Sequence, residues 1–180
     1  VVGYLSFSKG DLYNFDPAQH DRSFATPRSW SFVSDLLDST LSESAQTDIV
    51  AGCVGEGLAI KFMAHRKIAS KLPNPTDILL GKVKDLKVKE VSAMYSLTAS
   101  LCYELKDAYD NGKKADDLKA WHPMCEHFIQ YMMDNFEPEM VIMGAHTALK
   151  THALPFEHKK LKNFPEFFKK YAHLVIDIGT

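Results

Sequence analysis

Residues 24–37 read FATPRSWSFVSDLL and predict the start of an amphipathic helix. Thr26 is a favourable N-cap, because its hydroxyl can accept a hydrogen bond from a free amide of the first turn. Pro27 suits the first helical position, where a missing N–H is not needed. The apolar residues that follow recur at helical spacing and predict a wide buried stripe: Trp30, Val33, Leu37 and Leu41, flanked by Phe32 and Leu36.

Arg28 stands in the first turn of this predicted helix. A cation there opposes the helix dipole and gains nothing locally. A helix N-terminus together with an arginine is, however, a suitable place for a phosphate group. The alternative is a surface side chain that lies over Trp30 and contacts solvent. The local pattern alone leaves both interpretations open.

The composition is that of a globular protein. The chain has 180 residues, of which 46% are hydrophobic and 24% charged, so one compact domain or two small helical subdomains are expected. A net charge of −2 gives no overall field that would attract nucleic acid. No apolar run approaches the length needed to span a bilayer, and no signal peptide is recognisable. We therefore expect a cytoplasmic protein that binds neither membrane nor nucleic acid.

The first methionine is Met63, and the chain opens at Val1 in an apolar stretch. We therefore expect a fragment of a longer protein. The cysteines are odd in number and fall on apolar helix faces, which predicts buried, reduced thiols: Cys53, Cys102 and Cys125.

Proline and glycine divide the chain. Pro73-Asn74-Pro75 stops the preceding helix and marks a boundary between residues 1–72 and 73–180. Residues 1–15 predict two short helical pieces with a break near Ser8–Gly10. The three glycines of residues 49–57 indicate either a close helix–helix approach or a break between two helices, since glycine weakens a helix interior. We expect Thr47 or Asp48 to cap the helix that contains these glycines.

The second part has strong helical periodicity. Residues 91–109 keep the helical spacing for five turns, and Asn111-Gly112 should end that helix. A second stripe runs from Leu118 to Phe136, with Pro123 expected to kink the helix or delay its start. Further helices are expected from Pro138 and from Asn163, the last with Phe167, Phe168, Tyr171, Leu174 and Val175 buried. Thr76 should cap a short turn, and the lysine-rich residues 81–89 predict an edge strand or a loop.

Little catalytic chemistry is visible. His122, Cys125 and His127 lie close in sequence but lack the second ligand pair of a zinc site, so we expect no metal. Glu56, between two glycines, could be a buried, paired carboxylate. The histidines His146, His152 and His158 are expected to face solvent. No Gly-x-Ser-x-Gly elbow is present.

Several separate stretches together resemble the C-terminal part of MoxR-like AAA+ ATPases. They comprise Val1–Phe7, Phe15–Pro17, Ala25–Trp30 with Phe32–Ser34, Ala51–Glu56 and Leu72–Leu79. The resemblance is best over residues 1–105. It implies a multi-helix AAA+ lid-type bundle at residues 1–72. Because the periodicity is helical and no strand pattern is convincing, we expect an all-α fold with little or no sheet. In this fold, residues 73–180 form a C-terminal helical extension packed on the lid.

In that family the arginine of the Pro-Arg pair is the sensor-2 residue, which maps onto Arg28. The resemblance implies that Arg28, placed by Thr26 and Pro27, contacts the phosphates of ATP, with Mg²⁺ and most of the nucleotide held by a preceding ATPase domain. Family members form homo-oligomeric rings that remodel client proteins. This chain has no Gly-x-x-x-x-Gly-Lys-Ser/Thr motif, so alone it should not hydrolyse ATP.

Two other functions stay open from the sequence. The abundance of apolar helix faces favours a stand-alone helical interaction module without a nucleotide role. A helix-turn-helix DNA binder built from residues 45–72 and the lysine-rich connector is a third hypothesis, which the net charge opposes.

Overall fold

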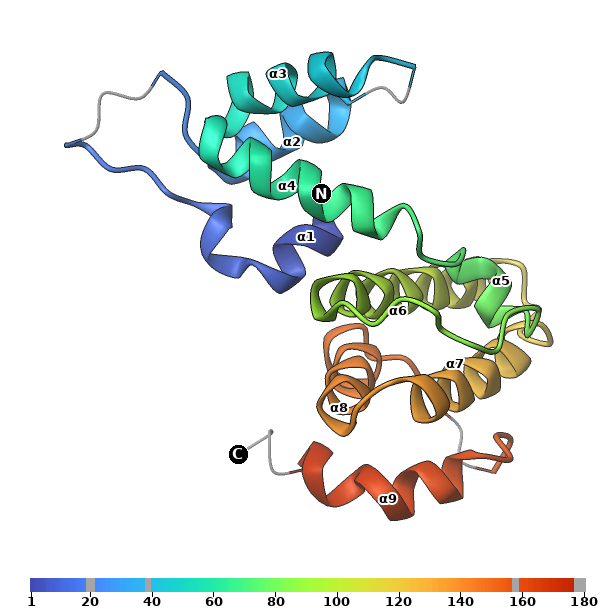
Figure 1. The fold of residues 1–180 in the computed structure, drawn as a ribbon. Helices are drawn as coiled ribbons and strands as arrows, with labels where there is room; N and C mark the ends of the chain where they lie inside the picture. The colour runs from blue at the N-terminus through green and yellow to red at the C-terminus, as the bar shows by residue number, and fades with distance from the viewer. Residues whose placement is uncertain (19–21, 38–39, 157–158, 177–180) are drawn as a thin grey trace. The chain divides into compact units, whose positions relative to one another are not determined.

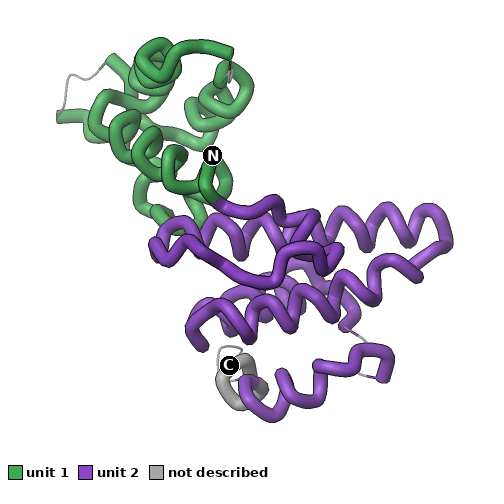
Figure 2. The backbone as a smooth tube through the Cα atoms, turned by 45° about the vertical axis from the view of Figure 1, so that its right-hand side comes forward, with its two compact units in different colours: residues 1–71 green, residues 72–180 purple. Residues whose placement is uncertain are grey.

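A computed structural model describes residues 1–18, 22–37, 40–156 and 159–176, with the backbone alone for residues 172–176. The described residues form helices and no strand, which confirms the all-α prediction (Figure 1). The chain divides into two compact units, Val1–Lys71 and Leu72–Thr180 (Figure 2). Among the described residues, no helix combines the length and the apolar character that crossing a membrane would require.

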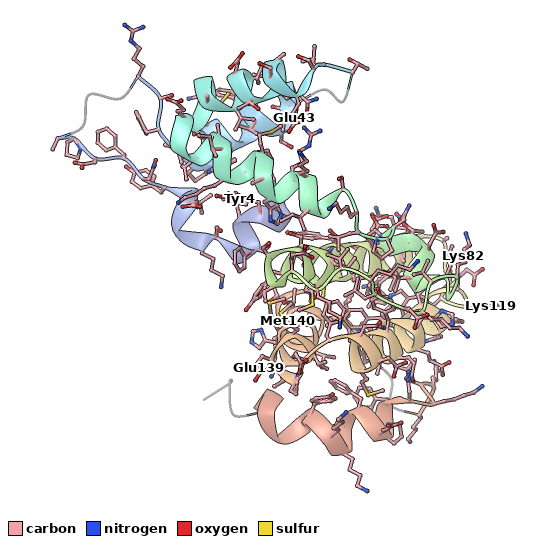
Figure 3. All side chains as sticks on the ribbon, in the orientation of Figure 1. Tyr4, Glu43, Lys82, Lys119, Glu139 and Met140 are labelled. Carbon is pink, nitrogen blue, oxygen red and sulfur yellow. The ribbon has the colours of Figure 1, made fainter. Side chains whose placement is uncertain are left out.

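Unit 1 begins with two short pieces separated at Ser8, α1 (Val2–Phe7) and the 3-10 helix η1 (Lys9–Leu12), as predicted. Three longer helices follow: α2 (Pro27–Leu36), α3 (Glu43–Val54) and α4 (Glu56–Ala69). Figure 3 labels Tyr4 on α1. Its ring packs edge-on against Phe62 of α4, with the centroids 5.5 Å apart. The core of the unit consists of Tyr4, Ala25, Trp30, Val33, Val50, Val54, Leu58, Ala59 and Phe62.

The buried stripe of α2 is narrower than predicted. Trp30 and Val33 are fully buried, and Leu37 is partly buried against the same core. Phe32 and Leu36, in contrast, are 45% and 55% exposed. Leu41 is also exposed. The prediction was wrong for these three residues, because in so small a unit the neighbouring helices cover only one edge of α2.

Gly55 separates α3 from α4. The break between these helices accounts for one of the three glycines of residues 49–57. The φ of Gly55, +95°, is a conformation that side-chain-bearing residues rarely adopt. Gly52 and Gly57 lie inside the two helices, and a Cβ on either would meet open space. The break between helices is therefore confirmed at Gly55, and the alternative of a close helix–helix approach is wrong.

Helix caps differ from the predicted ones at two places. The side chain of Ser42, rather than Thr47 or Asp48, caps α3 by accepting a hydrogen bond from the amide of Ala45. Asn74, rather than Thr76, caps the short helix α5 (Pro75–Leu79). In both cases the helix begins earlier than the apolar pattern suggested, and the polar residue directly before it takes the cap.

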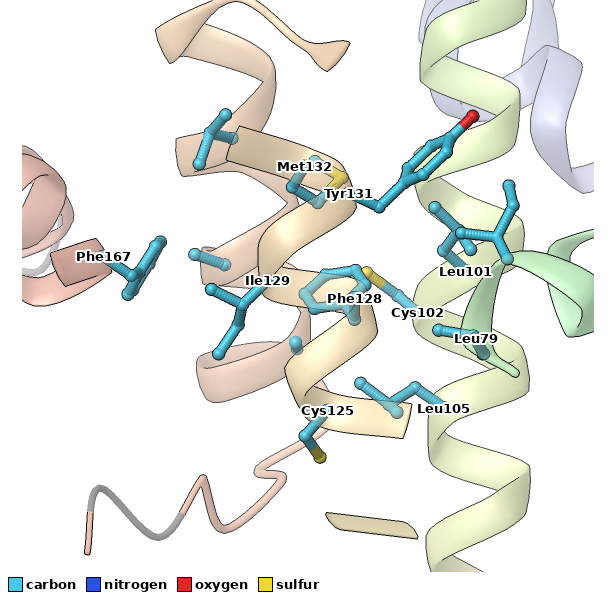
Figure 4. Packing of buried hydrophobic residues seen from close by; sticks show 14 of the residues in the cluster. Leu79, Leu101, Cys102, Leu105, Cys125, Phe128, Ile129, Tyr131, Met132 and Phe167 are labelled. Carbon is cyan, nitrogen blue, oxygen red and sulfur yellow. The ribbon is translucent and has the colours of Figure 1, made fainter. Parts of the chain in front are cut away.

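Unit 2 contains α5, the long α6 (Val91–Lys114), α7 (Trp121–Asn135), α8 (Pro138–His146) with a π-helical turn η2 (Thr147–Thr151), and α9 (Phe164–Ile176). Figure 4 shows Leu101 and Leu105 of α6 facing Phe128 and Cys125 of α7 across the core. Gly144 of α8 lies closely packed against this core. A Cβ there would lie 2.7 Å from Met132 Cε.

The predicted end of α6 at Asn111-Gly112 was wrong, because the helix continues to Lys114. Asp116 then takes the left-handed conformation, with φ of +53°. The amide of Asp117 donates to the Gly112 carbonyl at 2.9 Å and that of Asp116 to Lys113, which is a Schellman motif. Gly112 is required for this closure, since a Cβ on it would lie 2.8 Å from the Asp117 carbonyl oxygen.

Other expectations for unit 2 hold in part. Pro123 lies in the first turn of α7, where its missing N–H costs nothing, and residues 83–90 are a loop without strand pairing. In α9, Phe167 and Tyr171 are buried, but Phe168 is 54% exposed. The side chains of Leu174 and Val175 lie outside the described residues, as does His158.

Candidate functional site

The start of α2 is held by a reciprocal capping box. Thr26 Oγ1 accepts a hydrogen bond from the Ser29 amide at 3.0 Å, and Ser29 Oγ accepts one from the Thr26 amide at 2.8 Å. Pro27 occupies the first helical position. The N-cap and proline predictions are confirmed, while the partner in the box is a serine instead of the usual Glu or Gln.

Further bonds fix this start to the rest of unit 1. Asn14 pairs with Ala25 through two hydrogen bonds, one to the Ala25 carbonyl at 3.1 Å and one from its amide at 2.7 Å. The indole N–H of Trp30 donates to the carbonyl of Asp11 at 2.9 Å. Because Trp30 is buried, these contacts hold the backbone of the first turn in one position.

Arg28 projects from this fixed turn and is exposed. Its guanidinium lies over the ring of Phe32, 5.8 Å from the centroid, and not over Trp30 as the surface interpretation expected. No ion pair of Arg28 is found among the described residues, and the first turn of α2 contains no acidic residue. Arg28 is therefore a cation without a carboxylate partner in the described part of the unit.

A cavity of about 400 Å³ lies elsewhere in unit 1, at the N-terminus of α4. It is lined by Asn14, Arg22, Ser23, Val54, Gly55, Glu56, Gly57, Leu58 and Lys61. Thr26, Pro27 and Arg28 are not among the lining residues, so the structure does not bring the predicted site residues to this cavity.

The cavity combines two cations with a helix N-terminus that has no side-chain cap. Neither Arg22 nor Lys61 was singled out from the sequence, because nothing in the local pattern shows that they approach residues 54–58. Lys61 also lies 3.8 Å from a carboxylate oxygen of Asp11. Glu56 is exposed in the first turn of α4, where its charge already complements the helix dipole. The expectation of a buried, paired Glu56 was wrong.

The cysteine and histidine residues are placed separately. Cys102 and Cys125 are buried, and burial raises the pKa of the Cys102 thiol to about 12. Cys53 is only half-buried, against expectation, and His146 and His152 are also half-buried. His127 bonds the Leu79 carbonyl through Nδ1 at 2.8 Å. Within the described ranges, no three His, Cys, Asp or Glu side chains gather as a metal ion would require.

Comparison of the chain with protein-family models, with curated proteins and with solved structures found no match. The functional inference therefore rests on the residues of the chain itself.

Proposed function

We propose that unit 1 is the lid of an AAA+ ATPase and that Arg28 contacts the phosphates of ATP bound mainly by a preceding domain. The observation that carries the proposal is the position of Arg28, which has no carboxylate partner among the described residues, on a helix start held by the Thr26–Ser29 capping box and by Trp30. The resemblance of the Thr-Pro-Arg-Ser-Trp segment to MoxR-like proteins supplies the class.

The energies agree with such a role. A cation–π contact at an exposed site is worth about 0.5–1 kcal/mol. A hydrogen bond to a charged group contributes about 1.5–3 kcal/mol, and arginine can make two to a phosphate. A phosphate within reach would therefore draw Arg28 away from Phe32. Arg28 would then report whether the terminal phosphate is present, because the contact is lost on hydrolysis.

By itself, the chain can supply only part of a nucleotide-binding site. Arg28 supplies a permanent charge and a planar donor fork, while the sequence contains no phosphate loop that would hold ATP and Mg²⁺. The proposal therefore places the catalytic machinery in the preceding domain of a cytoplasmic ATPase. That ATPase would form a homo-oligomeric ring and remodel a client protein, with residues 73–180 as an extension that contacts the client or neighbouring subunits.

The experiment is ATP hydrolysis by the intact protein that contains this chain. Arg28→Ala is expected to lower turnover by about a hundredfold, the usual loss when one donor to developing charge is removed. Arg28→Lys keeps the charge but loses the fork and should be intermediate. Lys67→Ala is the control, since Lys67 is an exposed cation of the same unit that lies outside α2 and outside the cavity lined by Arg22 and Lys61. Unchanged turnover of Arg28→Ala would refute the assignment.

A second candidate function is a stand-alone helical interaction module. It is favoured by exposed apolar side chains in unit 1: Phe32 and Leu36 on α2, and the rings of Phe15 and Phe24, whose centroids are 4.8 Å apart. The reading frame upstream of Val1 separates the two candidates. The lid requires a Gly-x-x-x-x-Gly-Lys-Ser/Thr motif there, whereas a stop codon or a short leader would support the module.

The helix-turn-helix hypothesis gains no support. Helices α3 and α4 are separated by Gly55 alone, whereas the two helices of that motif are joined by a turn of about 3–4 residues.

A further inference from the structure

Unit 2 contains a cavity of about 340 Å³ on one face of α7. One wall is formed by α7 residues at positions i, i+3, i+4 and i+7, namely His127, Gln130, Tyr131 and Asp134. The facing wall consists of Ile78 in α5 and of Gly81, Val83 and Lys84, which follow that helix. The volume lies in the range of small-molecule sites, roughly 300–1,000 Å³.

The loop that forms the facing wall is hydrogen-bonded to α7, the helix that forms the first wall. Asn135, the last residue of α7, donates from its side-chain amide to the Lys84 carbonyl at 2.8 Å. Its Oδ1 accepts a hydrogen bond from the amide of Leu86, also at 2.8 Å. The cavity is therefore preformed, so a ligand would not have to order the loop on binding.

His127 is held in one orientation within this cavity. Its Nδ1 bonds the carbonyl oxygen of Leu79, which can only accept, so Nδ1 is the protonated nitrogen. In the neutral ring Nε2 is then a hydrogen-bond acceptor, and no described residue bonds it. Gly81, with φ of +74°, allows the ring to sit against its backbone, because a Cβ there would lie 2.7 Å from Nε2.

The charges around the cavity do not favour an ionic ligand. Lys84 and Asp134 are both exposed and of opposite sign. The two carboxylate oxygens of Asp134 each accept a hydrogen bond from the Gln130 amide at 3.0 Å. Ile78 and Val83 contribute apolar side chains to the rest of the lining. The buried Tyr131 completes it, and its hydroxyl has no hydrogen-bond partner among the described residues.

We propose that this cavity binds a small, neutral and mostly apolar molecule that carries one hydrogen-bond donor. The apolar body packs against Ile78, Val83 and the Tyr131 ring, and the donor, a hydroxyl or an N–H, bonds Nε2 of His127. This site belongs to unit 2 and does not depend on the nucleotide role proposed for unit 1.

The test uses the full chain, labelled with ¹⁵N, and two probes of similar shape. Phenol has an O–H donor, and anisole has a methyl group in its place. Phenol is expected to shift the amide signals of Gly81 and Val83 and the ring signals of His127 in a saturable manner. Anisole should bind about tenfold more weakly, the cost of leaving Nε2 without its partner. Equal affinities, or no saturable shift with phenol, would overturn the proposal.

Two variants and one control locate the site. Val83→Phe fills the cavity and should abolish phenol binding, whereas Val91→Phe places the same side chain at an exposed position outside it and should not. His127→Phe removes the acceptor and should reduce phenol to the affinity of anisole. If His127→Phe does not fold, two comparisons still test the proposal. They are phenol against anisole, and Val83→Phe against Val91→Phe. Full binding by a folded Val83→Phe variant would contradict the proposed location.

A third probe separates a free small molecule from a side chain of a partner protein. N-acetyltyrosinamide presents the same phenol group with peptide bonds on both sides. The proposal predicts that phenol shifts the signals of Gly81, Val83 and His127 at least as strongly as this probe. Binding of N-acetyltyrosinamide without any binding of phenol would overturn the small-molecule proposal in favour of a protein partner.

Discussion

Arg28 lies over the ring of Phe32, one turn further along α2, with 5.8 Å between the guanidinium carbon and the ring centroid. Both residues are exposed. A cation in the first turn of a helix thus rests on an aromatic ring on the same surface, without a carboxylate partner among the described residues. Without an anion nearby, Arg28 stays on the Phe32 ring. An anionic partner that binds the guanidinium more strongly than the ring does would draw it away.

The first prediction is that Arg28→Ala leaves the stability of the chain nearly unchanged. Losing the cation–π contact costs about 0.5–1 kcal/mol. Removing a cation from the first turn of α2 regains about 0.3–1 kcal/mol, because the helix dipole disfavours it there. The two effects nearly cancel. Urea unfolding should show a change below about 0.5 kcal/mol, within the range of surface substitutions. A larger loss would mean that Arg28 has a structural role.

The second prediction concerns the capping box. Thr26→Ala should lower the free energy of unfolding by about 0.5–2 kcal/mol, because the Ser29 amide loses its acceptor. Thr26→Ser keeps the hydroxyl and is the control. Since Ser29 bonds back to the Thr26 amide, Thr26→Ala and Ser29→Ala should be less than additive in a double-mutant cycle. Additive losses would show that the box does not act as a unit.

The third prediction contrasts two glycines inside helices. Gly144→Ala should destabilise unit 2 by about 1–3 kcal/mol, the usual cost of overpacking a core. The new Cβ would meet Met132 Cε at 2.7 Å and Thr98 Cγ2 at 3.1 Å. Gly52→Ala in α3 meets open space and should stabilise its helix by about 0.5–1 kcal/mol. Amide hydrogen exchange measures the stability of each unit separately. A stabilising Gly144→Ala would show that the core can relax around Met132.

The fourth prediction is a loss of stability at high pH. Burial raises the pKa of Cys102 from its ordinary value of 9.0 to about 12, and that of Tyr131 from 10.0 to about 12. Burial also raises the pKa of Cys125. Above pH 9 the unfolded chain therefore binds fewer protons than the folded one, and the free energy of unfolding falls as pH rises through this window.

Unfolding of unit 2 followed between pH 8 and pH 11 measures this slope. Cys102→Ala should make it shallower, because one of the shifted groups is gone. At pH 8, the same shift leaves about one Cys102 thiol in ten thousand ionised. Iodoacetamide should therefore modify the half-buried Cys53 well before Cys102. Reaction of Cys102 as fast as Cys53 would contradict the burial.

Local chemistry explains what the sequence could predict. Thr26 and Pro27 act within one turn, so the start of α2 could be recognised from four residues. The end of α6 could not, because Asn111-Gly112 has the usual composition of a helix end. The left-handed residue is instead Asp116, and the return of Asp117 onto Gly112 decides where the helix closes.

Contacts between segments account for what the sequence could not show. The period of α2 identified its apolar residues, but only the tertiary structure shows that Phe32 and Leu36 stay exposed. Arg22 and Lys61 meet at a cavity although 39 positions separate them in sequence. For His127 the sequence indicated only that a metal site is not expected. Its bond to Leu79 and its packing on Gly81 join residues far apart in the chain, so no local pattern shows them.

The most direct test of the central claim is the ATPase activity of the intact protein with Arg28→Ala beside the control Lys67→Ala. The account predicts that Arg28→Ala loses about a hundredfold in turnover. Its unfolding midpoint should be unchanged, and Lys67→Ala should hydrolyse ATP as the parent does. An Arg28→Ala protein that hydrolyses ATP at the parental rate, or an intact protein without ATPase activity, would contradict it.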